Sequence, residues 1–141
     1  MRKCALDVGD VRIGIAFSDI TGLIANPGET YRITGNENKD FGYIATQIKN
    51  KECDAIIVGL PLNMDGTEGD RVLKTRTFAE KLSQYVDIPI IFQDERLSTV
   101  SAEKMLIESG VRREKRKQVV DKIAASIILQ SYLDRINKNK F

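Results

Sequence analysis

The run Asp54-Ala55-Ile56-Ile57-Val58-Gly59-Leu60 decides the fold that this sequence predicts. It is almost continuously apolar and contains several β-branched residues, with no alternation between apolar and polar positions. A strand of this composition is typical of the centre of a sheet that is covered on both faces, as in α/β proteins. We therefore assign residues 54–60 to a central strand and place the neighbouring segments outward from it.

The segment before the central run predicts three strands and a helix. Two short apolar runs flank the turn residues Gly9 and Asp10, which is the pattern of a β-hairpin. A third extended stretch should begin after Pro27-Gly28, and a polar loop then leads into a helix. The expected elements are strands at residues 3–7, 12–18 and 29–33, followed by a helix at about residues 40–51.

The segment after the central run begins with a loop. Residues 61–69 contain one proline and two glycines and have no regular period, so they predict a mobile loop of the kind that contacts ligands. The strand, helix and strand around this loop imply a right-handed parallel crossover. The expected elements are a helix at about residues 70–85, a strand at 88–92, a helix from Ser98 or Thr99 to about Ser109, and a long final helix after Lys117.

Length and composition indicate one globular domain over residues 1–141, and the order of the expected strands and helices indicates the α/β class. The hydrophobic share is 42% and the charged share 30%, which is ordinary for a globular protein. No apolar run is long enough to cross a bilayer, so we expect a cytoplasmic protein without a membrane partner. Cys4 and Cys53 lie in or beside apolar runs without CxxC spacing, and we expect both to be core thiols.

The charged residues limit the chemistry that is available. The sequence contains no histidine, which excludes Ser/His/Asp triads, histidine metal ligands and imidazole bases. Any catalysis must therefore use carboxylates, metal ions or lysine. Residues 111–141 hold nine Lys or Arg against three Asp or Glu, whereas the preceding residues hold 13 against 17. Basic charge concentrated in one segment suits a protein that holds a polyanion at one place.

Three acidic residues stand where α/β proteins place catalytic groups, beyond strand ends or beside a packed helix. Asp7 interrupts the first apolar run near its end, and Glu95 stands just beyond the last predicted strand. Asp121 lies on the flank of the apolar stripe of the final helix. Asp7 could instead cap a turn, and Asp121 could be a helix-start carboxylate. Asp94 or Glu95 could instead form an ion pair with Arg96.

Together these carboxylates would form an oxygen-rich site suited to Mg²⁺ or Mn²⁺. Such ions lower the pKa of bound water and neutralise charge on a phosphate, so a protein without histidine can cleave phosphodiesters. Nearby basic side chains would hold a nucleic acid by its phosphates without reading its bases, although a solvated loop is an equal alternative for the basic run. The expected phosphate contacts are Arg12, Arg96, Arg112, Arg113, Lys115, Arg116 and Lys117.

Four motifs are spread from the first predicted strand to the last helix. They are Asp7-Val8-Gly9-Asp10-Val11-Arg12-Ile13-Gly14-Ile15-Ala16, Val58-Gly59-Leu60-Pro61-Leu62-Asn63-Met64-Asp65-Gly66, Asp94-Glu95-Arg96-Leu97-Ser98-Thr99, and Lys115-Arg116-Lys117 with Val120-Asp121. In this order they closely resemble the motifs of the YqgF family, also called RuvX. Four motifs in the right order make this resemblance much more specific than any one of them.

The resemblance implies a ribonuclease H-like fold, with a five-stranded mixed sheet in the order 3-2-1-4-5, the second strand antiparallel, and helices on both faces. It also implies a metal-dependent nuclease with its acidic positions at Asp7, Glu95 and Asp121. Asp94 is an alternative or additional ligand. The role proposed for the family is maturation of the 5′ end of the precursor of 16S ribosomal RNA, and its older assignment is the resolution of Holliday junctions.

We expect a nuclease that acts on structured RNA, as a monomer or a weak homodimer. A DNA four-way-junction resolvase could use the same site, but would need a dimer to cut opposite strands. A non-catalytic nucleic-acid-binding factor could instead bind through residues 112–117. Half of an actin-like ATPase is disfavoured, since one domain is too short to close over ATP. We expect the loop at residues 61–69 to close over the bound strand near the acids.

Overall fold

A mixed sheet of five strands forms the centre of the computed structural model, which describes residues 1–96, 110 and 113–138, with the backbone alone for 113–122. The strand order is β3-β2-β1-β4-β5. β2 is antiparallel to both neighbours, whereas β1, β4 and β5 are parallel. The predicted strand order is therefore confirmed. The elements are β1 (Arg2–Val8), β2 (Arg12–Ser18), β3 (Ala25–Arg32), α1 (Glu37–Asn50), β4 (Cys53–Leu60), α2 (Asp70–Leu82), β5 (Ile90–Asp94) and α4 (Arg113–Asn137).

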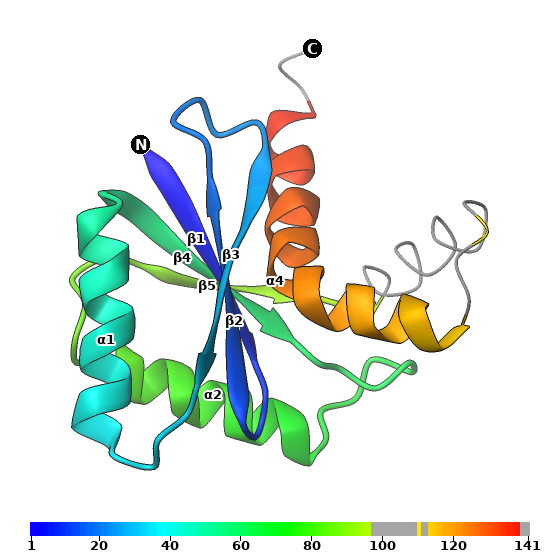
Figure 1. The fold of residues 1–141 in the computed structure, drawn as a ribbon, viewed down its shortest axis with the longest axis horizontal. Helices are drawn as coiled ribbons and strands as arrows, with labels where there is room; N and C mark the ends of the chain where they lie inside the picture. Colours follow the sequence, from blue (N-terminus) through cyan, green and yellow to red (C-terminus); the bar gives the residue numbers. More distant parts are fainter. Residues whose placement is uncertain (97–109, 111–112, 139–141) are drawn as a thin grey trace.

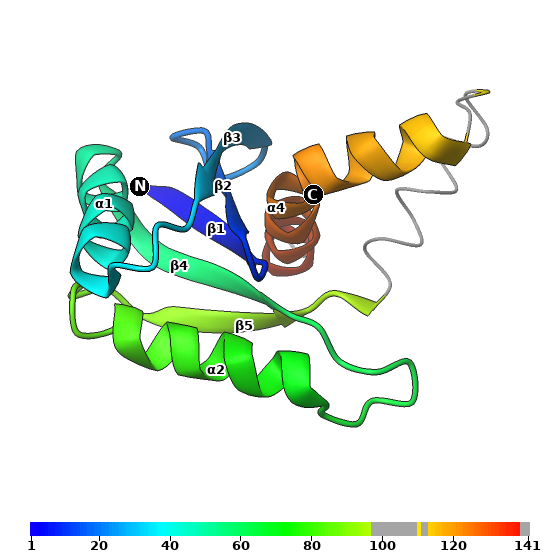
Figure 2. The ribbon, with the colours of Figure 1, turned by 60° about the horizontal axis from the view of Figure 1, so that its bottom comes forward.

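β4 is covered on both faces, as its apolar run predicts. Ile56 and Val58 are fully buried in a core that includes residues of α1 and α2, whereas Ile57 is fully buried against α4. Figures 1 and 2 show the resulting layers, with α1 and α2 on one side of the sheet and α4 on the other. The α/β class with helices on both faces is therefore confirmed.

β3 begins at Ala25 instead of Glu29, so Pro27 and Gly28 lie inside the strand rather than before it. The sequence prediction was wrong here because it took these two residues as a turn. β3 is an edge strand, where the missing N–H of a proline is tolerated. The pairing of β2 with β3 also shifts register at this point. A side chain at position 28 would overlap the carbonyl oxygen of Ile15, so glycine permits the two strands to approach closely.

β5 covers Ile90–Asp94 rather than residues 88–92. Pro89 has no N–H to donate, and its carbonyl accepts a hydrogen bond from the Ile56 N–H at 2.9 Å as the chain enters the sheet. The strand therefore starts two positions later than its apolar run suggests. As a result, Asp94 is the last residue of the strand and Glu95 follows it directly.

Three helices differ from their predicted bounds. α4 begins at Arg113 rather than after Lys117, so most of the basic run forms the start of the helix instead of a loop before it. α1 begins at Glu37 rather than at residue 40, because the Asn36 side chain caps it by accepting from the Lys39 N–H at 3.1 Å. α2 ends at Leu82 rather than at residue 85. The helix expected from Ser98 or Thr99 to Ser109 lies outside the described residues. Among the helices that are described, none is both long and apolar enough to cross a membrane.

Candidate active site

Two of the predicted acids meet at the carboxyl edge of the parallel strands. Asp7 is the penultimate residue of β1, and Glu95 directly follows β5. β4 lies between these two strands, and the Glu95 N–H donates to the carbonyl of Leu60 at 3.3 Å, which fixes the backbone of Glu95 beside the end of β4. Figure 2 shows that the ends of β1, β4 and β5 point toward the same edge of the molecule.

The absence of a side chain at Gly59 makes room for Glu95. A Cβ atom at position 59 would overlap Oε2 of Glu95 and would lie 2.5 Å from Cδ1 of Ile128 in α4. The Glu95 carboxylate therefore occupies the space above Gly59, on the face of the sheet that α4 covers. Because β4 is the strand between β1 and β5, this space directs the carboxylate from β5 toward Asp7.

Burial is the main reason that the pKa of Glu95 rises, from 4.5 to about 7, and the negative charge of Asp7 raises it further. Asp94 adds a smaller effect in the same direction, and Arg71 opposes them. A half-buried carboxylate beside a second carboxylate is stabilised by a cation placed between them. The pair has the hard oxygen donors that Mg²⁺ and Mn²⁺ prefer, and so it fits the predicted metal.

This raised pKa predicts a pH-dependent cost to stability. The folded protein binds the Glu95 proton more tightly than the unfolded chain, so stability should fall as the pH rises from about 4.5 to about 7. The full cost above pH 7 is about 3 kcal/mol. Glu95→Gln should remove most of this cost, which urea unfolding in EDTA at pH 5 and pH 8 would measure. We expect Glu95→Gln to be stabilising at pH 8 and nearly neutral at pH 5.

Glu80→Gln is the matched control for this experiment, because Glu80 is an exposed carboxylate of α2. It should change stability by the same small amount at both pH values. If Glu95→Gln changed the free energy of unfolding equally at pH 5 and pH 8, the burial of a charged Glu95 would be contradicted.

α4 brings the third predicted acid toward the same edge. The position of a Cβ atom at Gly14 lies 3.5 Å from Cβ of Asp7 and 3.5 Å from Cβ of Ala125, so α4 passes beside Asp7 at Ala125. The other end of α4 is fixed at the opposite edge, where the Asn137 side chain donates to the Gly22 carbonyl at 2.9 Å. Asp121 precedes Ala125 by one helical turn and so lies toward the carboxyl ends of the strands.

The side chain of Asp121 lies outside the described part of the chain. Among the side chains that are described, no three acidic or cysteine residues lie close enough together to hold a metal ion. The described part of the candidate site is therefore the pair Asp7 and Glu95.

Asp94 and Arg96 form an ion pair beside Glu95. The Arg96 backbone N–H donates to Oδ1 of Asp94 at 2.9 Å, and Nε of Arg96 donates to Oδ2 at 2.8 Å. The hydrogen bond from Arg96 is the main reason that the pKa of Asp94 is lowered. The sequence left open whether Asp94 and Glu95 pair with Arg96 or act as carboxylates of the site. The structure shows the ion pair for Asp94, whereas Glu95 is the carboxylate that lies beside Asp7. Arg96, which the sequence suggested as a phosphate contact, is held by this pair.

The other predicted phosphate contacts are only partly described. Arg12 begins β2 and is exposed beside the turn that follows Asp7. The backbone at residues 113–117 forms the first turns of α4, which extend away from the sheet in Figures 1 and 2. The side chains of Arg113, Lys115, Arg116 and Lys117, and the whole of Arg112, lie outside what is described.

Sequence reasoning missed two basic residues on α2. Arg71 and Lys74 line a small cavity of about 210 Å³ on the α1 and α2 side of the sheet, which Val8 also lines. Lys74 forms an exposed ion pair with Asp10 at 3.3 Å, and the charge of Arg71 reaches Glu95. Arg71 and Lys74 are three positions apart in the first turns of α2, so they lie on one face of the helix just after the end of β4 and its loop. This spacing in the sequence could have identified them as candidates. Both are cations on the α2 side of the sheet, and Arg71 is the one whose charge acts on Glu95.

Arg71→Gln should therefore weaken the binding of a nucleic-acid strand about fivefold near 0.1 M salt and lower the slope of log Kd against log salt by about one. Fluorescence anisotropy over a salt series would measure both quantities. Lys81→Gln is the control, because Lys81 lies at the far end of α2 and pairs with Glu37 at 2.5 Å. An unchanged salt slope for Arg71→Gln would exclude Arg71 as a phosphate contact.

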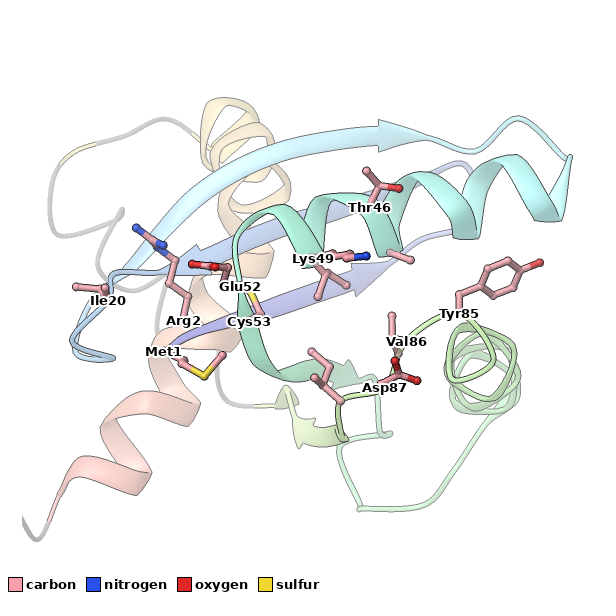
Figure 3. Close-up of a pocket in the computed structure, with 13 residues that line it drawn as sticks. Met1, Arg2, Ile20, Thr46, Lys49, Glu52, Cys53, Tyr85, Val86 and Asp87 are labelled. Atoms are coloured by element: carbon pink, nitrogen blue, oxygen red, sulfur yellow. The ribbon is translucent and has the colours of Figure 1, made fainter.

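A larger cavity, of about 830 Å³, lies at the opposite edge of the sheet, away from the acids. Figure 3 shows that side chains from the amino-terminal residues, the end of α1, the start of β4 and the segment between α2 and β5 line it. Cys53 lines this cavity, and burial raises its pKa to about 11. Cys4 is also buried and unpaired with Cys53, so both are core thiols, as predicted.

Comparison with known proteins identifies relatives over nearly the whole chain. Residues 1–135 match the model of the family described as "RuvX: Holliday junction resolvase". A protein of Halalkalibacterium halodurans named "Putative pre-16S rRNA nuclease" is 50% identical over 136 residues, which cover 96% of this chain and 97% of the relative. A protein of the same name from Thermoanaerobacter pseudethanolicus is 50% identical over 141 residues, 99% of this chain and 100% of the relative.

Among solved structures, the fold is similar to "T. thermophilus RuvC in complex with Holliday junction substrate". The TM-score is 0.57 and the identity 12%, over 96% of each chain. A second structure, "Thermus thermophilus RuvC structure", gives a TM-score of 0.53 at 13% identity over 97% of each chain. At these identities the likeness concerns the fold, which is the ribonuclease H-like fold that the motifs predicted.

Proposed function

Since this chain belongs to the RuvX family, we propose that it is a divalent-metal-dependent nuclease whose site is formed by Asp7, Glu95 and Asp121. The observation that carries this proposal is the carboxylate of Glu95, which fills the space above Gly59 and has its pKa raised to about 7 beside Asp7. A protein gains nothing in stability from this arrangement. Its placement at the carboxyl edge of a parallel sheet is the placement of a functional site.

The residues of this chain would hold the metal and the substrate in different ways. Asp7 and Glu95 would be the ligands from the sheet, and Asp121 the ligand from α4. A bound Mg²⁺ or Mn²⁺ would activate water and neutralise the charge that develops on the phosphate. Arg71, together with the basic residues at the start of α4, would hold the nucleic-acid backbone across the edge of the sheet. Asp94 would fix Arg96 rather than serve as a further ligand.

The substrate that we propose is the precursor of small-subunit ribosomal RNA, cut at its 5′ end in the cytoplasm. The names of the relatives at 50% identity support this choice. A second candidate is a four-way DNA junction, which the description of the family supports. Both substrates would use the same acids, so the site alone favours neither.

Cleavage of the two substrates would distinguish these candidates. Purified protein and Asp121→Asn would be incubated with Mg²⁺ or Mn²⁺ on a labelled precursor-rRNA 5′ leader and, separately, on a labelled DNA four-way junction. We expect the wild type to cleave the RNA leader and Asp121→Asn to lose at least 99% of this rate, about 100-fold. Asp134→Asn is the control, because Asp134 is an exposed acid of the same helix.

Symmetric cuts in the junction without RNA cleavage would instead identify a resolvase. Tight binding of both substrates without cleavage, by both proteins, would identify a non-catalytic binding factor and overturn the proposal.

A further inference from the structure

The loop between β4 and α2, residues 61–69, is folded by its own hydrogen bonds. The Asn63 N–H donates to the Thr67 carbonyl at 3.0 Å, and the Gly66 N–H donates to the Asn63 carbonyl at 2.8 Å. Gly66 has a positive φ of 88°, which the turn requires and which favours glycine. These bonds place Met64 and Asp65 at the tip of a tight turn.

Arg96 connects this tip to the acidic site. Nη1 of Arg96 donates to the Met64 carbonyl at 3.3 Å, while its Nε donates to Asp94 at 2.8 Å. A Cβ atom at Gly66 would lie 3.2 Å from the same Nη1, so the guanidinium packs directly beneath the turn. Because Arg96 follows Glu95 in the chain, one residue sets the position of the tip relative to the carboxylates.

The acidic side chains of the loop are engaged within the protein. Asp65 accepts hydrogen bonds from the N–H and the hydroxyl of Thr67, at 2.9 and 2.6 Å. Glu68 pairs with Arg76 of α2 at 2.7 Å. These hydrogen bonds and this ion pair reduce the repulsion that Asp65 and Glu68 would otherwise exert on a phosphate backbone.

Met64 is the apolar group that this tip presents. Its side chain is 70% exposed, although it is large and apolar. Methionine is flexible and polarisable and makes favourable contacts with aromatic rings, and apolar side chains of this kind insert between bases in nucleic-acid complexes. We propose that Met64 packs against a nucleobase of the bound strand, next to the phosphate that the acids hold. This proposal rests on the nuclease function proposed above.

The test measures binding in an Asp7→Asn background, so that it does not depend on cleavage. The probe is the precursor-rRNA leader with 2-aminopurine at successive positions, whose fluorescence reports the stacking of that base. Met64→Ala should weaken binding about fivefold, which is the loss of affinity expected when a thioether–aromatic contact is removed. It should also abolish the fluorescence change at one position of the leader. Met64→Leu, which retains the apolar volume, should restore most of both signals.

Ile20→Ala is the matched control, because Ile20 is 69% exposed but lies at the opposite edge of the sheet. It should leave affinity and fluorescence unchanged. Normal binding by the Asp7→Asn parent with no effect of Met64→Ala would overturn the role of Met64 alone. Failure of both the wild type and the Asp7→Asn parent to bind any nucleic acid would overturn the proposed function, and the role of Met64 with it.

Discussion

Replacing Asp7 by asparagine is expected to reduce metal-dependent cleavage by at least about 100-fold, which exceeds the usual effect of losing an outer-shell partner of a metal site. The reason is that asparagine keeps the shape of the side chain but removes one of the two negative charges that face each other above the edge of the sheet. Single-turnover cleavage of the labelled leader would measure the loss. Calorimetric titration with Mn²⁺ should show weaker metal binding by the same variant.

The stability of Asp7→Asn separates loss of chemistry from loss of fold. Because the charge of Asp7 contributes to the raised pKa of Glu95, its removal should lower that pKa toward its ordinary value, and the thermal midpoint in EDTA should not fall. Asp87→Asn is the control, since Asp87 is exposed at the opposite edge of the sheet. A cleavage rate for Asp7→Asn within a factor of two of wild type would exclude Asp7 from the site.

Gly59→Ala should both destabilise the fold and reduce cleavage, because it fills the space that Glu95 occupies. The added methyl group would overlap the Glu95 carboxylate and approach Ile128 of α4, and both neighbours belong to packed parts of the structure. We expect a loss of about 1–3 kcal/mol in the free energy of unfolding. Cleavage should fall as well, since Glu95 must move away from Asp7. Urea unfolding and the single-turnover rate would measure the two effects.

Gly42→Ala is the matched control for this substitution. Gly42 lies inside α1, where a Cβ atom would meet nothing within 4 Å, and alanine there should stabilise the helix by about 0.5–1 kcal/mol. If Gly59→Ala were as stable and as active as wild type, the placement of Glu95 above Gly59 would be wrong.

Much of the fold could be predicted from the sequence because its signals are local. The apolar run at residues 54–60 needs two covered faces, and Ile56 and Ile57 face opposite helical layers as a result. The same reasoning brought Asp7 and Glu95 together, since parallel strands end at one edge of a sheet. Local signals also misled at two prolines. Pro27 was taken as a strand boundary but lies inside β3, whereas Pro89 was placed inside a strand that begins only after it, at Ile90.

The rest of the site depends on contacts between distant residues, which no local pattern reports. Gly59 matters because of Glu95 and Ile128, and its role is visible only once α4 lies across the sheet. The charge of Arg71 reaches Glu95 from another helix for the same reason. The sequence left Asp94 open between ligand and ion pair, and only the side-chain geometry shows its bond to Arg96.

The most direct test of the central claim is the single-turnover rate of leader cleavage as Mn²⁺ is titrated into metal-free protein. If Asp7 and Glu95 form a metal-dependent nuclease site, the rate should be zero in EDTA, should rise to saturation with Mn²⁺, and should require a higher Mn²⁺ concentration at pH 6 than at pH 8, because protonated Glu95 cannot bind the ion. Cleavage at the full rate in EDTA, or a rate that does not respond to Mn²⁺, would contradict it.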